Sequence, residues 1–423
     1  MRKLIRSIYN AIVFSAYSPK IIDRLFIKNT RSISKRNYVK SSGVIRRSQL
    51  LIDVSVIFQS DSATGIQRMV RSVLNELRSN PPVNFDVRTV VATRNLPYRY
   101  VDWDRGNVGG LTENAIVSPQ AGDIFLALDL SAHILPSHHF QLVEWKANGV
   151  AFHFLIYDLL PLINENWFSK KLVLAFRRWI KQAVALADSA ICISSSVEND
   201  FLQWTYQSYN LPPGTIPTNV ISLGSDISSN KSSSGLPEEF DKIIDKVNSF
   251  KTALIVGTLE PRKAHLQIIE AFEKLWDKGS QFNLVIVGKK GWKTETLQKK
   301  ILNHEEFNSR LFWLSNASDE ALIALYKACS GVIVASYAEG YGLPLTEALD
   351  HKKPVLARDI PVFREQRREG VEYFSARDEI HLENKIHDWL ITAKDINLYT
   401  APCSLPSWDQ TANEIKKIIT QQN

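Results

Sequence analysis

Three segments of the chain each follow an apolar run of the kind that forms a buried strand. They are residues 257–263 (GTLEPRK), 288–292 (GKKGW) and 336–347 (SYAEGYGLPLTE). All three contain glycines, the first two contain cations, and the first and third contain carboxylates. Glycines at the start of a helix leave backbone N–H groups that can bind an anion, and Arg or Lys can neutralise a diphosphate. Because carboxylates accept hydrogen bonds from hydroxyl groups, the three segments together predict a pocket for a nucleotide diphosphate that carries a hydroxyl-rich group.

The positions of the charged residues favour ligand binding over a purely structural role. Arg262 and Lys263 are predicted at the start of a helix, where cations oppose the helix dipole, so an anionic ligand would explain them. Glu339 lies between a predicted strand and a glycine, with no helix to cap. Glu347 is predicted in the first turn of a helix, where the dipole alone favours a carboxylate by about 0.3 to 1 kcal/mol. Its register with Glu339 and the intervening glycines favours a role in binding.

Several other classes of site lack their motifs in this chain. The sequence contains neither GxGxxG nor GxxxxGK[ST], which disfavours a dinucleotide oxidoreductase and a P-loop kinase or ATPase. Its three cysteines, Cys192, Cys329 and Cys403, form no CxxC pair, so neither a zinc module nor a disulfide framework is predicted. His153, on an apolar predicted strand, is as expected for a packed core histidine.

Short strands alternate with helices from residue 48 onward, which predicts parallel sheets covered by helices. The strands predicted in the first half are residues 50–57, 85–91, 123–128, 150–157, 190–193 and 219–223, and a helix begins at Gly65. Those predicted in the second half are residues 253–256, 283–287, 311–314, 331–335 and 354–357, with helices that begin near residues 263, 293, 318 and 344. The three polar segments follow strands, where ligands bind in open α/β sheets.

A polar segment, residues 228–235 (SSNKSSSG), separates the two halves and predicts a linker. We therefore expect an α/β protein with two Rossmann-like domains whose parallel sheets face a central cleft. The first would span residues 48–235 and the second residues 236–406.

The N-terminal arm, residues 1–47, carries all of the excess positive charge. It holds twelve Lys or Arg and one acid, a net +11, whereas the whole chain carries +7, so the remainder carries −4. This distribution argues against a basic body that binds nucleic acid. Apolar residues recur in the arm at helical spacing, at Leu4, Ile5, Ile8, Ile12, Ile21, Ile22 and Leu25. A basic helix of this kind can bind an anionic membrane surface, here through residues 1–44; the alternatives are packing on the protein's own body or on a partner protein. No apolar run is long enough to span a bilayer.

The spacing of Glu339 and Glu347 is the E-x7-E pattern, which resembles the donor-site signature of the retaining GT-B glycosyltransferases of family 4. Residues 257–263 resemble the diphosphate-binding segment of that family, residues 311–315 with Asp319 and Glu320 its nucleobase-side loop, and residues 357–365 (ARDIPVFRE) continue the match. In the first half, residues 64–68 (TGIQR) resemble its first glycine loop, residues 157–161 (YDLLP) its mid-domain loop and residues 193–196 the strand end that follows. Residues 407–409 (SWD) resemble the start of a helix, residues 407–423, that completes the first domain.

The resemblance implies a role for each matching residue. Arg262 and Lys263 would hold the donor diphosphate, together with Gly257, Thr258 and Gly288. Glu339 would bind the hydroxyls of the donor sugar with the backbone of Gly340, Tyr341, Gly342 and Leu343, while Glu347 would bind the ribose and Leu314 and Ser315 would lie by the base. Asp158 would serve in catalysis or cap the turn before Pro161, and Gly65, Arg68, His153 and Tyr157 would form the acceptor side. The chain departs from the family at Thr258, where many members have Arg, and at Tyr157, where many have His; His153 is the substitute candidate.

The strongest similarity is to bacterial enzymes of O-antigen, capsule and exopolysaccharide assembly. It implies a peripheral membrane enzyme at the inner face of the bacterial inner membrane, transferring mannose from GDP-mannose to a lipid-linked oligosaccharide with retention. Neither a cofactor nor a metal ion is expected, because Arg262, Lys263 and helix dipoles would stabilise the leaving diphosphate. Residues 102–104 (DWD) match the metal-binding DxD motif of GT-A transferases, but we interpret them as a surface turn. The alternatives are a dTDP-rhamnose or UDP-sugar donor, and a non-catalytic scaffold that binds other glycan assembly enzymes.

Overall fold

The computed structural model describes residues 15, 18–33, 47–61, 64–104, 115–227, 233–366, 369–375, 377–393 and 405–421. The chain divides into two compact units, Met1–Leu223 with Trp408–Asn423, and Gly224–Ser407. The division lies earlier than the boundary expected after residue 235, because Ser225 already donates its backbone N–H to Pro406 O of the second unit. The predicted linker falls partly outside the described residues. Its described end is attached to the second unit, since Ser233 donates to the carboxylate of Asp319.

The second unit is built on six parallel strands in the order β10-β9-β8-β11-β12-β13. The strands are β8 (Thr252–Val256), β9 (Asn283–Val287), β10 (Leu311–Leu314), β11 (Gly331–Val334), β12 (Val355–Arg358) and β13 (Val371–Phe374). Numbered within the unit, this is the order 3-2-1-4-5-6 of a Rossmann sheet, whose ligand crevice lies where the order reverses, here between β8 and β11. The Rossmann-like topology expected for this half is confirmed.

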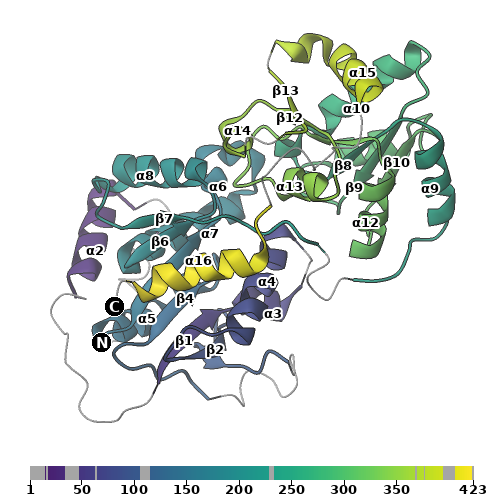
Figure 1. The fold of residues 1–423 in the computed structure, drawn as a ribbon. Coiled ribbons are helices and arrows are strands. Elements are labelled where there is room, and N and C mark those ends of the chain that lie inside the picture. The colour runs from purple at the N-terminus through teal and green to yellow at the C-terminus, as the bar shows by residue number, and fades with distance from the viewer. Residues whose placement is uncertain are drawn as a thin grey trace. The chain divides into compact units, whose positions relative to one another are not determined.

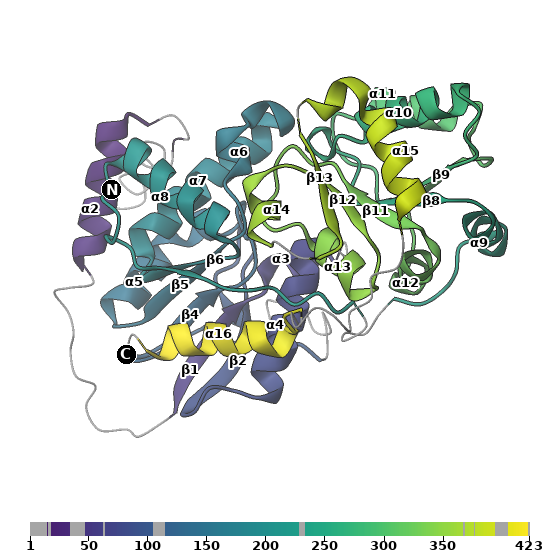
Figure 2. The same cartoon turned by 45° about the horizontal axis from the view of Figure 1, so that its top comes forward.

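Helices cover both faces of this sheet, which is why its strands are apolar on both sides (Figure 2). One core lies under α10 (His265–Asp277) and α15 (Leu382–Thr392). The other lies under α9 (Phe240–Ser249), α12 (Asp319–Ala328) and α13 (Leu343–Asp350). The shorter helices are α11 (Glu295–Leu302), α14 (Pro361–Glu365) and the 3-10 turns η3 (Pro261–Lys263) and η4 (Asp378–His381).

The first unit has a seven-stranded sheet in the order β3-β2-β1-β4-β5-β6-β7, parallel except for β3. Its strands are β1 (Ser48–Asp53), β2 (Phe85–Val91), β3 (Arg99–Tyr100), β4 (Ile124–Ala127), β5 (Ala151–Ile156), β6 (Ser189–Cys192) and β7 (Thr218–Val220). Its helices are α2 (Lys20–Ile33), α3 (Ser55–Gln59), α4 (Gly65–Ser79), α5 (His139–Ala147), α6 (Leu160–Ile163), α7 (Lys170–Leu186) and α8 (Ser195–Tyr209), with the 3-10 turns η1 (Leu135–His138) and η2 (Glu165–Trp167). Two parallel-sheet α/β domains are therefore present, as predicted.

The C-terminal helix α16 (Trp408–Thr420) belongs to the first unit, where it packs along α4 (Figure 1). Trp408 is buried, and the Thr411 hydroxyl donates to Ser222 O at 2.8 Å. Ser222 in turn donates its N–H to the Glu414 carboxylate at 2.8 Å. These bonds attach the end of the chain to the segment that follows β7.

The strand predicted over residues 50–57 is too long, and this prediction is wrong at its C-terminal end. The strand stops at Asp53, and α3 begins at Ser55. The backbone N–H groups of Val56 and Ile57 donate to the carboxylate of Asp129, at 2.7 and 2.8 Å. The helix start is therefore held both by the distant Asp129 and by Asp53, which accepts the Ser55 N–H at 3.0 Å.

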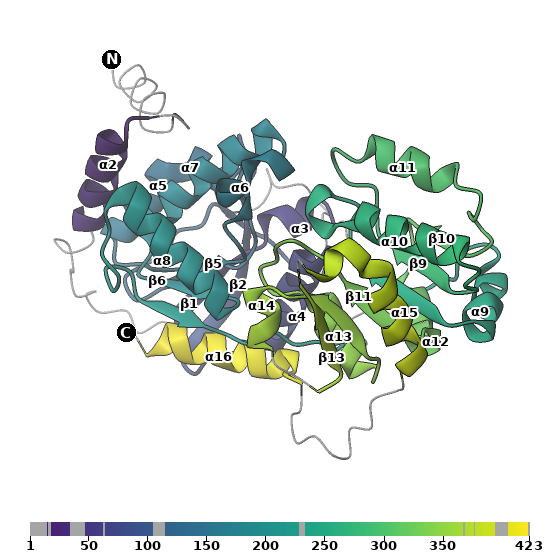
Figure 3. The same cartoon turned by 90° about the horizontal axis from the view of Figure 1, so that it is seen from above.

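Helix α2, in the N-terminal arm, is packed on the first unit (Figure 3). Its Phe26 and Ile27 are buried. Asp23 pairs with the buried Lys181 of α7 at 2.6 Å, and Arg31 donates to the carbonyl oxygens of Val184, Ala187 and Thr215. Of the alternatives given for the N-terminal arm, packing on the protein's own body is therefore confirmed for α2. The predicted apolar residues Leu4, Ile5, Ile8 and Ile12 lie outside the described residues.

Candidate functional site

The site is built on the loops that follow β8, β9 and β11, at the reversal point of the second sheet. The first two loops are packed backbone against backbone. Gly257 donates its N–H to Val287 O at 2.9 Å, and a Cβ on Gly288 would lie 1.9 Å from the Gly257 oxygen. Only glycine fits at position 288, so the two predicted loops form one rigid floor.

Lys263 extends across this floor. Gly257 has a φ of +147°, and a Cβ there would lie 3.2 Å from Lys263 Cε. Lys263 belongs to the turn η3, which ends at the left-handed Ala264, and α10 begins only at His265. The predicted helix start near residue 263 is therefore two residues early. Both cations lie in a turn that faces the loop after β11.

The two cations meet Glu339, which is carried by that loop. Lys263 Nζ lies 2.5 Å from Glu339 Oε1, and Arg262 Nη1 lies 2.6 Å from Oε2. Ser336 also donates a side-chain hydrogen bond to this carboxylate. Burial alone would raise the pKa of Glu339, but Arg262 and Lys263 beside it lower the pKa to about 2. The carboxylate is therefore ionised and held by three donors.

A second carboxylate completes the charge balance. Glu260 is buried and pairs with Arg262 Nη2 at 2.7 Å. Arg262 thus bridges Glu260 and Glu339, and the cluster of two cations and two carboxylates has no net charge. Neither Glu260 nor Ser336 was predicted in the site, although each stands within one of the three motif segments. An incoming diphosphate would have to take over cation contacts that carboxylates hold in this structure.

Hydrogen bonds to backbone oxygens fix the loop after β8, which carries the two cations, to the loop after β11, which carries Glu339. Tyr337 donates its N–H to Arg262 O at 2.8 Å, and Arg262 Nη1 donates to Ala338 O at 3.1 Å. The loop then passes through Gly340 and Tyr341 to Gly342, whose φ is +93° and where a Cβ would lie 2.4 Å from Phe363. This left-handed glycine starts α13.

The second glutamate of the pair lies deeper than expected. Glu347 is the fifth residue of α13, beyond the first turn in which the dipole was expected to act, and its side chain is buried. Its Oε2 accepts a hydrogen bond from the Tyr326 hydroxyl of α12 at 2.9 Å. The E-x7-E spacing thus places one carboxylate, Glu339, in the loop after β11 and the other, Glu347, in α13.

The predicted base-side residues are the last residue of β10, Leu314, and the one directly after it, Ser315. Leu314 is buried and accepts the Gly288 N–H at 3.0 Å through its carbonyl, while the neighbouring Trp313 donates its indole N–H to Gly288 O at 2.9 Å. Ser315 comes next and is half-buried. The acids Asp319 and Glu320 hold the backbone of Ser233 and Gly235. Apart from Glu347, Asp319 and Glu320, which lie in helices, the predicted residues of the second unit therefore stand at or after the carboxyl ends of four adjoining strands.

The predicted residues of the first unit are more dispersed. Gly65 opens α4 after Thr64, whose side chain forms a capping box with Gln67, and Arg68 follows three residues after Gly65, just under one turn further on. Asp158 accepts the Leu160 N–H at 3.0 Å, which is the capping role considered for it. Tyr157 is buried and donates its hydroxyl to Leu128 O at 2.6 Å.

The candidate role of His153 as a substitute base has no support in the structure. Its side chain is 1% exposed in the middle of β5, and Nδ1 lies 2.7 Å from the Ser189 hydroxyl. Burial lowers its pKa to about 4, so the imidazole is neutral. His153 is the packed core histidine that the apolar strand pattern favoured.

The first unit contains a polar cluster that was not predicted, at the carboxyl ends of β1 and β4. Asp53 accepts hydrogen bonds from the hydroxyls of Tyr98 at 3.0 Å and Ser131 at 2.9 Å, besides Ser55. Burial raises the pKa of Asp53, and burial with the nearby Asp53 charge raises the pKa of Asp129 to about 7. Apart from Ser55, the partners of Asp53 come from distant segments, so the pattern along the sequence does not reveal this cluster.

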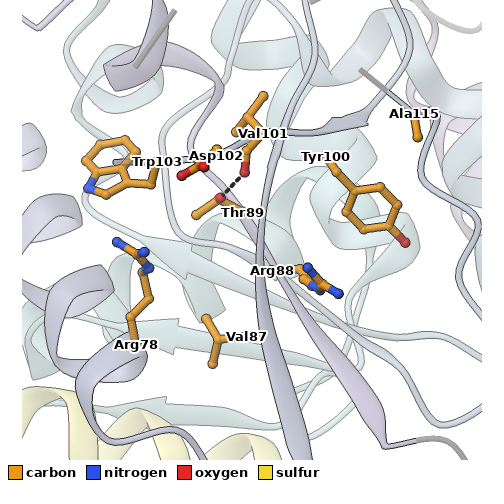
Figure 4. A pocket seen from close by; sticks show the side chains of 9 residues that line it. All are labelled: Arg78, Val87, Arg88, Thr89, Tyr100, Val101, Asp102, Trp103 and Ala115. Carbon is orange, nitrogen blue, oxygen red and sulfur yellow. Dashed lines mark hydrogen bonds between the residues drawn. The ribbon is translucent and has the colours of Figure 1, made fainter. Parts of the chain in front are cut away.

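A hollow of about 440 Å³ lies elsewhere on the first unit (Figure 4). Arg78, Tyr100, Asp102 and Trp103 are among its lining residues, and none of the predicted site residues lines it. Residues 103–104 form a turn, and Asp104 pairs with Arg78 at 2.5 Å, which agrees with the surface turn predicted for residues 102–104. Over the described part of the chain, no group of three His, Cys, Asp or Glu side chains is placed to hold a metal ion. In that same part, no helix is long and apolar enough to cross a membrane.

Comparison with known proteins agrees with this geometry. Residues 237–397 match the family described as "Glycosyl transferases group 1". The chain is 37% identical over 348 residues to the serotype-specific mannosyltransferase WbdA of Escherichia coli, a match that covers 81% of this chain and 42% of WbdA. It is 27% identical to the O-antigen chain mannosyltransferase RfbU of Salmonella typhimurium, over 53% of this chain and 56% of RfbU.

The fold also matches solved structures. The structure of Anabaena Alr3699/HepE in complex with UDP and glucose superposes with a TM-score of 0.54 at 18% identity, over 88% of this chain and 97% of HepE. The two-domain GT-B fold expected from the sequence is therefore present. The match to WbdA covers most of this chain but less than half of the length of WbdA.

Proposed function

We propose that the chain is a retaining mannosyltransferase of O-antigen assembly that uses GDP-mannose, because residues 237–397 match the group 1 glycosyl transferases. The observation that carries the proposal is the cluster of Arg262, Lys263 and Glu339 at the reversal point of a Rossmann sheet inside the matched segment. Mannose is favoured by the names of the relatives, both of which are mannosyltransferases.

The cluster can bind a diphosphate by exchanging partners. Lys263 and Arg262 would turn from Glu339 towards the donor phosphates, and the freed carboxylate oxygens would accept hydrogen bonds from the sugar hydroxyls. Binding of the phosphates to the two cations would thus free Glu339 to bind the sugar. Glu347 would bind the ribose in the same way, by sharing its carboxylate with the Tyr326 hydroxyl.

Catalysis would come from electrostatic stabilisation of the leaving group. Charge develops on the diphosphate as the bond to the anomeric carbon breaks, and pre-placed donors for that charge typically contribute about 10²- to 10³-fold each. One diphosphate oxygen would take the proton of the acceptor hydroxyl on the same face, which gives retention. Arg262 and Lys263 would supply the positive charge, so we propose that no metal ion is required.

The test is transfer from a panel of sugar nucleotides to a lipid-linked oligosaccharide. We expect transfer from GDP-mannose, retention of the anomeric configuration in the product, and no loss of rate with EDTA. Transfer from dTDP-rhamnose or a UDP-hexose instead would keep the reaction class and correct the donor. No transfer from any donor would favour the alternative, a non-catalytic scaffold in a glycan assembly complex.

We further propose that the chain works at the inner face of the bacterial inner membrane, where a lipid-linked acceptor resides. The outward side of α2 supports this. Ile21 is 67% exposed and Leu25 54% exposed, one turn apart, and Lys20, Arg24 and Lys28 are exposed beside them. Apolar side chains flanked by cations bind the headgroup region of anionic bilayers.

We expect the double substitution Ile21→Ser and Leu25→Ser to reduce flotation of the full chain with phosphatidylglycerol vesicles. These residues face outward, so the variant should keep the melting temperature of the wild type, whereas deleting residues 1–44 would also strip the buried face of α2. Exposed Lys299→Ala on α11 is the control. Undiminished flotation of the double variant would mean that α2 is not the membrane contact.

A further inference from the structure

A buried arginine at the end of β12 has no part in the proposed reaction so far. Arg358 is the last residue of the strand and is 6% exposed. Its Nε donates to the oxygen of Ala335, the first residue after β11, at 2.8 Å. Its Nη2 donates to Gln267 of α10, and its Nη1 pairs with Glu379 of η4. One guanidinium thus joins the ends of two central strands to two helical segments.

The same guanidinium lies against the ring of Tyr337. Its Cζ is 4.2 Å from the Tyr337 ring centroid and 5.0 Å from that of Phe374. Phe374 is fully buried, whereas Tyr337 is 42% exposed. A cation near an aromatic face is attracted by the ring quadrupole, and the attraction is stronger where water is excluded. Arg358 therefore connects the core of the sheet to a ring at the surface.

Tyr337 connects in turn to the Arg262–Glu339 pair. It stands two residues before Glu339, and its backbone N–H donates to Arg262 O at 2.8 Å. The loop that carries Glu339 is thus fixed at Ala335 by a hydrogen bond from Arg358 and at Tyr337 by the stacked guanidinium. A shift of Arg358 would move both attachment points of this loop.

We infer that Arg358 is a positioning residue for the cluster of Glu339, Arg262 and Lys263. The inference rests on the proposed function, because the consequence of positioning is measured by transfer. Lysine could not substitute, since the site uses three separate nitrogens of a planar guanidinium and its flat face, whereas an ammonium carries its donors on one nitrogen and has no flat face. Displacement of reacting groups by about 1 Å can cost on the order of 10²-fold in rate.

The first test compares Arg358→Lys with Arg310→Lys. Arg310 is a matched control because it also pairs with a carboxylate, Glu306, donates to a carbonyl, that of Ser280, and lies over a ring, that of Trp276. It precedes β10, at the amino ends of the strands. We expect both variants to have a lower melting temperature than the wild type. Only Arg358→Lys should lower kcat, by about 10- to 100-fold. Equal kcat values for the two folded variants would overturn the inference.

Substitutions at the exposed Tyr337 test the same contact without risk to the core. Tyr337→Phe keeps the ring and should keep the wild-type rate, whereas Tyr337→Leu should lose about tenfold. If the ring acts through Arg358, Tyr337→Leu should cost little more in the Arg358→Lys background. An undiminished loss in that background would contradict the inference.

A third readout does not depend on activity, and it separates this inference from the proposed function. If Arg358 positions the Glu339 loop, Arg358→Lys and Glu339→Gln should be non-additive in chemical unfolding, although the pair is joined only through the loop. Strictly additive losses would overturn the inference even if the wild-type chain transferred no sugar. Failure of transfer alone, with coupling present, would count against the proposed reaction and leave the positioning role standing.

Discussion

Glu339→Ala is expected to lower the transfer rate by about 10²- to 10³-fold, the usual loss when one pre-placed group at a reacting centre is removed. The substitution removes the hydroxyl acceptor proposed for the donor sugar and also frees Arg262 and Lys263, which the carboxylate now holds at 2.6 and 2.5 Å. The measurement is kcat with saturating donor, on protein shown to be folded by circular dichroism.

Loss of stability must be separated from this loss of rate. Removing one partner of a buried ion pair typically costs about 3 to 5 kcal/mol, so Glu339→Gln, which keeps hydrogen-bonding capacity, is the milder variant. Glu372→Ala, at an exposed carboxylate paired with Lys385, is the matched control and should keep the wild-type rate. A Glu339→Gln variant that is folded and fully active would show that the charge of Glu339 is not needed.

The low pKa of Glu339 gives the direction of a pH effect on stability. A carboxyl whose folded pKa is about 2 stabilises the folded state fully above its unfolded pKa, near 4.5, and loses this contribution as pH falls through 2. The stability difference between wild type and Glu339→Gln should therefore shrink as the pH is lowered from 5 towards 2. A constant difference would mean that folding does not lower the pKa of Glu339.

Lys263→Ala is expected to lower kcat/KM by about 10²-fold. Lys263 crosses the Gly257 loop with its side chain 13% exposed, and its ammonium is the cation placed over the floor formed with Gly288. Its removal takes away positive charge from the proposed leaving-group site. Lys263→Arg should recover part of the rate, because the charge is kept.

The control for this prediction is Lys299→Ala, at an exposed lysine of α11 in the same unit. If Lys299→Ala and Lys263→Ala lower kcat/KM equally, general electrostatic attraction of the donor would explain both losses. If neither changes it, the diphosphate is not held by Lys263.

Much of the fold was predictable because central parallel strands are apolar on both faces and helices follow each of them. The strands β2, β9 and β10 begin and end where the sequence predicts. Two strands were missed: β3 has only two residues, and β13 places Glu372 on its exposed side, which breaks the apolar run. Both lie at sheet edges, where burial leaves a weaker signature.

The positions of the charged residues after the strands were predictable, but their contacts and the part taken by Glu260 and Ser336 were not. Sequence position correctly placed Arg262, Lys263 and Glu339 after neighbouring strands, yet it gave no indication that the cations and the carboxylate bind one another. Such pairing depends on the close approach of the Gly257 and Gly288 loops. Arg358 shows the same limit more strongly, because each of its partners comes from a different segment and only the folded sheet brings them together.

We propose that the second unit binds a sugar linked to a nucleotide diphosphate, and thermal unfolding with a panel of sugar nucleotides tests this binding. GDP-mannose at 100 times its dissociation constant should stabilise the folded chain by about 2.7 kcal/mol. The Arg262→Ala and Lys263→Ala variants should lose that stabilisation at the same concentration. If no GDP-, UDP- or dTDP-sugar stabilises the wild-type chain, or if the variants respond as it does, the claim is contradicted.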